Sequence, residues 1–127
     1  MTEQKIGGKP LAEWDAEWTA LEGGLRVPHP ELRGKIGLFR TVVNNTVTYL
    51  GCATEGKGRG LRKRLADFVR PSENGRRHHA GKLIYQHRDQ VQVEVLIVGE
   101  DYRAGIIATQ LKTALLAQGR PAWNVPL

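Results

Sequence analysis

The feature that most constrains the fold is a hairpin signature in residues 37–51, GLFRTVVNNTVTYLG. Two apolar runs flank a central Asn-Asn pair, and asparagine tolerates the positive φ angles that a tight hairpin turn requires. An aromatic residue stands two positions inside each terminal glycine: Phe39 follows Gly37, and Tyr49 precedes Gly51. The stretch therefore predicts two antiparallel strands with an aromatic ring beside a glycine at the ends.

Apolar periodicity predicts the remaining elements. Helices are indicated where apolar residues recur every three or four positions, and strands where they alternate with polar ones. The patterns place a helix in the stretch 10–26 that Gly23-Gly24 ends, further helices over 61–70, 78–88 and 99–119, and a strand over 91–98 that is buried at its apolar end. The inward residues expected in the last helix are Ile107, Leu111, Ala114, Leu115 and Ala117. The element order predicts an α+β fold in which helices cover a small sheet.

Residues 1–36 form an N-terminal amphipathic helix and linker in this interpretation, and residues 37–127 form the domain proper. The apolar face of the expected helix carries Leu11, Trp14, Trp18 and Leu21. Two prolines around His29 disfavour helix and predict the linker. The helix is expected to pack on the domain core, and the alternative is that its two tryptophans bind a protein partner.

Positive charge is concentrated in one part of the chain. The net charge is +6, and residues 57–82 contain nine basic residues against two acidic ones. A clustered excess of this kind is typical of a polyanion binder, so DNA is the expected partner. Beside Arg64, the basic residues expected to contact nucleic acid are Lys57, Arg59, Arg62, Lys63, Arg70, Arg76, Arg77 and Lys82.

Other patterns exclude several classes of protein. No apolar run approaches the ~20 residues that span a bilayer, and the first ten residues lack the apolar segment of a signal peptide, so a cytoplasmic protein with no membrane partner is expected. The single cysteine, Cys52, excludes an internal disulfide and a cysteine-cluster zinc site. The spacing of His78, His79 and His87 does not fit a metal site, and these histidines are expected to be solvated.

Several motifs in residues 37–125 resemble those of GIY-YIG nucleases. GLF and YLG are separated by nine residues, as the two signature tripeptides of the family would be. The run YLGCATEGKGRGLRKRLADFVR is similar to the corresponding run of the bacterial excision-repair incision subunit, and LLAQGRPAWNV resembles that family's closing pattern. The resemblance implies a three-stranded antiparallel sheet flanked by helices, here with an extra N-terminal helix, and hydrolysis of DNA phosphodiesters.

The resemblance also implies roles for individual residues. In the family a phenol helps to activate water, an arginine stabilises the phosphate, a glutamate holds one divalent metal and an asparagine supports the site. The corresponding residues here are Tyr49, Arg64 and Asn124, with Phe39 in the place of the first tyrosine. Phe39 has no hydroxyl and cannot activate water.

The position of the metal-binding glutamate is occupied by Lys112, and Cys52 stands where the repair enzyme has a lysine. A lysine repels a divalent cation, so no metal cofactor is expected. Three interpretations stay open. The chain is a DNA-binding pseudoenzyme without cleavage, or a lysine-assisted endonuclease that uses the ammonium as a fixed cation. Otherwise the last helix is misaligned, and a Mg²⁺- or Mn²⁺-dependent endonuclease uses Glu94 or Glu100.

Overall fold

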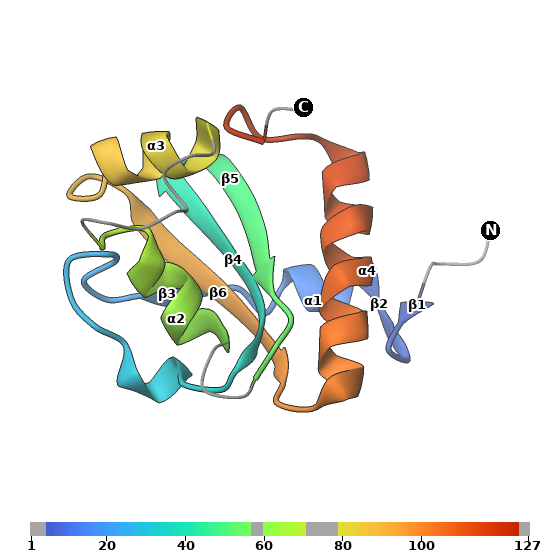
Figure 1. Cartoon of the computed structure of the whole chain (residues 1–127). Coiled ribbons are helices and arrows are strands. Elements are labelled where there is room, and N and C mark those ends of the chain that lie inside the picture. The colour runs from blue at the N-terminus through green and yellow to red at the C-terminus, as the bar shows by residue number, and fades with distance from the viewer. Residues whose placement is uncertain (1–4, 57–59, 71–78, 125–127) are drawn as a thin grey trace.

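The computed structural model describes residues 5–56, 60–70 and 79–124, which form an α+β fold (Figure 1). The N-terminal elements are β1 (Lys5–Ile6), β2 (Lys9–Pro10), α1 (Leu11–Asp15), β3 (Thr19–Leu21) and the 3-10 turn η1 (Pro30–Leu32). The following elements are β4 (Ile36–Val43), β5 (Thr46–Ala53), α2 (Gly60–Asp67), α3 (His79–Gln86), β6 (Gln92–Gly99) and α4 (Tyr102–Gln118). Every helix and strand expected after residue 36 is therefore present.

The main sheet has four antiparallel strands in the order β3-β6-β4-β5, so the expectation of three strands was wrong. The predicted hairpin is confirmed as β4 and β5. Asn44 and Asn45 form its turn with φ angles of 51° and 63°, the left-handed conformation that favours asparagine or glycine. The additional strand is β3, which pairs with β6 from the N-terminal segment.

The helix expected in the stretch 10–26 was also wrong beyond Asp15, because tertiary contacts divide the periodic residues between two elements. Trp14 is buried, and its indole N–H donates to the carbonyl of Ile6 at 2.8 Å. Trp18 lies beyond the helix, with the guanidinium of Arg40 4.2 Å from its ring centroid. The next three residues pair with β6, since strand pairing satisfies the backbone of both segments and outweighs a weak helical preference.

The expected linker is packed rather than open. Leu32, in η1, is 2% exposed and belongs to the core. His29 is buried, and its Nε2 lies 2.5 Å from the carbonyl oxygen of Gly24. This contact joins the two ends of the segment 24–29.

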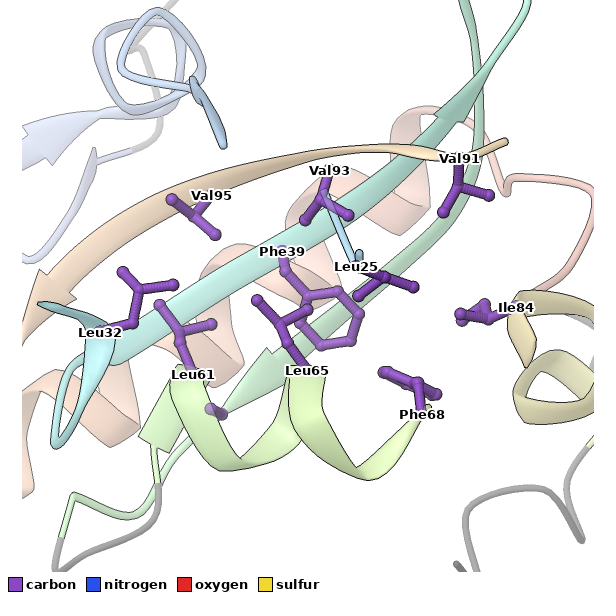
Figure 2. Close-up of a cluster of buried hydrophobic side chains, with 11 residues drawn as sticks. Leu25, Leu32, Phe39, Leu61, Leu65, Phe68, Ile84, Val91, Val93 and Val95 are labelled. Atoms are coloured by element: carbon purple, nitrogen blue, oxygen red, sulfur yellow. The ribbon is translucent and has the colours of Figure 1, made fainter. Parts of the chain in front are cut away.

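Helices cover both faces of the sheet. Figure 1 shows α2 and α3 on one side and α4 on the other. The α2 face encloses a core centred on Phe39, with Leu61, Leu65 and Phe68 from the helix side (Figure 2). The α4 face encloses a second cluster that includes Trp14 from α1.

Two details of burial differ from expectation. The end of β6 is not buried, since Ile97 is 44% exposed. The neighbouring strand β3 is short and pairs only with residues 93–95 of β6, so it does not extend alongside Ile97. In α4, Leu111 is buried as expected, whereas Ala117 is exposed near the end of the helix. Asp101 caps the start of α4 and Gly119 its end.

Within the described part of the chain, no helix has the length and apolar character needed to cross a membrane.

The glycines of the hairpin are explained by close packing. Phe39 pairs with Gly51 across the two strands. A Cβ at Gly51 would lie 2.6 Å from Cζ of Phe39 and 2.9 Å from Cε2 of Tyr49. A Cβ at Gly37 would lie 2.1 Å from the carbonyl oxygen of Leu96 in β6. The absence of a side chain at Gly37 thus allows β6 to pack closely, and its absence at Gly51 leaves room for two aromatic rings.

We predict that Gly51→Ala destabilises the protein by about 1–3 kcal/mol, because the added methyl group overpacks the core at Phe39. Urea unfolding measures the effect. Gly119→Ala is the control, since a Cβ there meets no atom within 4 Å. Adding Phe39→Leu to Gly51→Ala should cost less than the sum of the two single changes. Strict additivity would contradict the ring contact as the cause.

Candidate functional site

Phe39 is a core residue in this structure. Its side chain is fully buried, and its ring centroid lies 5.8 Å from that of Tyr49 and 5.6 Å from that of Phe68. Figure 2 shows the ring between the sheet and α2. Phe39 therefore supports the position of Tyr49 by packing and offers no polar group.

Tyr49 lies half-buried on the α2 face of β5. Burial raises the pKa of its phenol, the positive charge of Arg64 opposes this increase, and Cys52 adds to it. Since the net change is upward from 10.0, the phenol keeps its proton at neutral pH. Tyr49 is thus suited to donate a hydrogen bond to an anionic oxygen, and the charge of Arg64 acts on the phenol from the α2 side.

A hollow of about 230 Å³ lies between the end of β5 and α2. Its lining includes Cys52 and Glu55 from the β5 side, and Lys63, Arg64 and Asp67 from α2. Arg64 is exposed and forms no ion pair with any described residue. The hollow therefore presents a guanidinium that has no ion-pair partner among the described residues, although the carboxylates of Glu55 and Asp67 line the same hollow.

Ion pairs divide the basic cluster into two groups. Asp67 pairs with Lys63 at 3.0 Å and with Arg70 at 3.6 Å, so this one carboxylate partly compensates both cations. Arg62 and Lys82 are exposed and have no acidic partner among the residues described. Lys57, Arg59, Arg76 and Arg77 lie outside the described residues. The Lys63–Asp67 spacing of four on α2 was a signal in the sequence that reasoning from total charge overlooked.

Asn124 holds the outer edge of β5. Its side-chain oxygen accepts from the backbone N–H of Leu50 at 2.8 Å, and its side-chain nitrogen donates to the Leu50 carbonyl at 2.9 Å. The backbone N–H of Trp123 donates to the carbonyl of Thr48 at 2.8 Å. The C-terminal segment thus pairs with the strand on both sides of Tyr49. Asn124 acts here as a positioning residue for that strand.

Lys112 lies on α4, on the opposite face of the sheet from α2. A Cβ at Gly105 would lie 2.7 Å from the carbonyl oxygen of Thr54, just after β5, which identifies the side of α4 facing that strand. Lys112 follows two helical turns later and lies on the same side. Arg64 and Cys52 are the side chains whose charges shift the pKa of Tyr49. The side chain of Lys112 would have to pass the edge of β5 to reach the phenol.

The alternative metal ligands are engaged elsewhere. Glu94 pairs with Arg40 at 2.6 Å across adjacent strands, and Glu100 pairs with Lys35 at 3.2 Å. Residues 5–56, 60–70 and 79–124 contain no group of three or more His, Cys, Asp or Glu side chains that would hold a metal ion. Glu94 and Glu100 would each have to leave a basic partner before either could bind a metal ion.

The aromatic and histidine side chains considered for other roles make internal contacts. The Trp14 indole is buried, and the Trp18 indole N–H donates to Asp15 at 2.8 Å. The expectation of a solvated His87 was wrong: its Nδ1 lies 2.9 Å from the Leu83 carbonyl oxygen, and its ring packs 5.3 Å from that of Trp123. His79 is exposed, and His78 lies outside the described residues.

Comparisons of the chain with protein-family models, with curated proteins and with solved structures find no match. The GIY-YIG resemblance rests on the sequence motifs alone.

We predict that Arg64→Ala raises the pKa of Tyr49 further, because it removes the charge that favours the phenolate. Arg62→Ala removes an equal charge and should have no effect. Alkaline titration of phenolate absorbance measures the pKa, with a Tyr49→Phe variant identifying the Tyr49 transition among three tyrosines. Since folding raises this pKa, the stability contributed by neutral Tyr49 is present at neutral pH and is lost above about pH 10. Identical titrations of the two arginine variants would contradict the pairing.

Proposed function

We propose that this protein is a DNA-binding domain with a GIY-YIG-like arrangement and a degenerate catalytic site. The observation that carries the proposal is the placement of Arg64, without an ion-pair partner among the described residues, beside the protonated phenol of Tyr49. A guanidinium and a phenol O–H are both donors, and together they suit a phosphate with several acceptor oxygens.

The surrounding residues have separate parts in this proposal. Arg64 binds a phosphate oxygen pair through its planar fork, and Tyr49 donates to a neighbouring oxygen. Asn124 holds the strand that carries Tyr49, and Phe39 packs behind the phenol. Arg62 and Lys82 supply positive potential that attracts the DNA backbone. In the sequence, the basic residues of 57–59 and 71–78 lie close to Arg62 and Arg64 and belong to the same basic cluster.

The proposal is binding rather than metal-dependent cleavage for reasons of residue chemistry. Phe39 cannot take the part of a tyrosine, and Lys112 cannot ligate a divalent cation. Glu94 and Glu100 would first have to leave their basic partners. An active endonuclease, whether metal-dependent or lysine-assisted, is the second candidate, favoured by the retained Tyr49–Arg64 pair.

The third candidate, a protein-interaction module built on Trp14 and Trp18, has less support. Trp14 is buried within the α4-side core, and Trp18 is held between Asp15 and Arg40. Both indoles are therefore engaged inside the molecule and present no shared helical face.

We predict that Arg64→Ala weakens DNA binding roughly tenfold, the effect of losing one charge-assisted contact. Arg62→Ala should cost less, because Arg62 attracts the backbone only through long-range charge. Arg103→Ala, an exposed site on α4, is the control for net charge. Fluorescence anisotropy with labelled DNA at several salt concentrations measures both affinity and its salt dependence. Equal losses of DNA affinity in all three variants would mean that only the net charge matters, and would contradict the proposed role of Arg64.

We predict that the wild-type protein leaves supercoiled plasmid intact with Mg²⁺, Mn²⁺ or EDTA. Lys112→Glu restores the carboxylate of the family beside the edge of β5, and it should bind Mn²⁺ and nick plasmid weakly. Lys112→Gln removes the charge without adding a ligand and is the matched control. Gel electrophoresis of the plasmid gives the readout, and calorimetry measures Mn²⁺ binding.

Other outcomes of this experiment select the second candidate. Cleavage by the wild-type protein only with Mg²⁺ or Mn²⁺ would establish a metal-dependent endonuclease. Cleavage in EDTA that Lys112→Gln abolishes would establish a lysine-assisted one. Either result would overturn the assignment of a degenerate site.

A further inference from the structure

A second and larger hollow, of about 490 Å³, lies on the other side of α2 from the Arg64 hollow. One wall is the segment 24–29, and the other is formed by α2 and the residues that follow it, including Val69. We call it the α2 groove. Arg62 and Arg64 are two residues apart on a helix, so their side chains leave opposite sides of α2. Of these two arginines, Arg64 lines the smaller hollow and Arg62 lines the α2 groove.

The wall formed by residues 24–29 is fixed by internal contacts. Gly24 has a φ of +55°, and a Cβ there would lie 3.0 Å from the Val91 carbonyl oxygen. The backbone N–H of Arg26 donates to the Gly23 carbonyl at 2.9 Å. His29, buried at the end of the segment, contacts the carbonyl oxygen of Gly24. The groove is therefore formed before any ligand arrives.

The α2 groove combines apolar and cationic surface. Leu25, Leu65 and Val69 provide apolar lining. Val27, on the outer wall, is 46% exposed. Two exposed arginines, Arg26 and Arg62, also line the groove and have no acidic partner among the described residues. Such a combination suits a ligand with a flat apolar part and a nearby anion.

Lys63 lines both the α2 groove and the Arg64 hollow, so the two are neighbours across the helix. Because Asp67 partly compensates Lys63, the two arginines of α2 that have no acidic partner among the described residues, Arg62 and Arg64, lie on either side of this ridge. A polymer with regularly spaced anions would contact both sides by crossing α2. This continuity favours a nucleic-acid strand over a separate acidic peptide.

We propose that the α2 groove holds an unpaired nucleotide of the DNA strand whose neighbouring phosphate lies at Arg64. The base would lie against Val27 and Val69, and Arg26 and Arg62 would bind the flanking phosphates. The inference rests on the proposed DNA-binding function and extends its site to the N-terminal segment.

The test uses the full chain and fluorescence anisotropy with labelled single-stranded oligothymidine. Arg26→Ala should weaken binding roughly tenfold and reduce the slope of log affinity against log salt by about one. Arg103→Ala is the control of equal charge. Val27→Ser should weaken binding of oligothymidine but not of an abasic strand of equal length, because the abasic strand retains the phosphates and lacks the bases. Circular dichroism verifies that each variant is folded.

The contrary outcomes separate the two proposals. If Arg26→Ala behaves like Arg103→Ala while Arg64→Ala still weakens binding, the groove is outside the interface and the proposed function stands. If the wild-type protein binds no oligonucleotide, both proposals fail. Equal losses of Val27→Ser on both strands would overturn the base contact. Polyglutamate of equal charge serves as a competitor for the oligonucleotide. If it displaces the strand from the wild-type protein but not from the Arg26→Ala variant, the groove is an acidic-peptide site instead.

Discussion

The packing of Phe39 over Gly51 is the contact on which the rest of the structure depends. Gly51 has no side chain, so the ring of Phe39 packs directly over the backbone of β5. The same ring also contacts Phe68, which follows α2. The same ring contacts Tyr49 and holds the phenol at the side of the sheet that α2 covers. A core contact thus determines where the candidate site lies.

Charge pairing determines which cations are available to a ligand. Residues 57–82 are strongly basic, but Asp67 partly compensates Lys63 and Arg70 at the centre of the cluster. Arg62 and Arg64 keep their charge on opposite sides of one helix. Among the described residues of α2, the two arginines without an acidic partner therefore lie on either side of a ridge whose charge Asp67 reduces, and this arrangement is more specific than a uniformly basic face. A strand that crosses the helix satisfies both.

The sheet separates residues that the family resemblance groups together. Tyr49 and Arg64 lie on the α2 face, Lys112 starts on the α4 face, and Asn124 holds the strand edge between them. To reach a ligand at Tyr49 and Arg64, the side chain of Lys112 would have to pass the edge of β5. This arrangement is why binding at Tyr49 and Arg64 and cleavage assisted by residue 112 are separable by mutation.

Local sequence was sufficient for the β4–β5 hairpin, α2, α3 and α4, because each depends on turn residues, caps and periodicity within a short stretch. The family resemblance places Tyr49 and Arg64 in one site, and this stays a prediction. Tertiary structure decided the rest. β3 forms because β6 offers it a partner more than seventy residues away in sequence, and the segment 24–29 becomes a groove wall through contact with α2. Lys112 is set apart from Arg64 by the sheet. Such outcomes depend on which distant segments meet, and the free energy of those contacts is not encoded in any single stretch of chain.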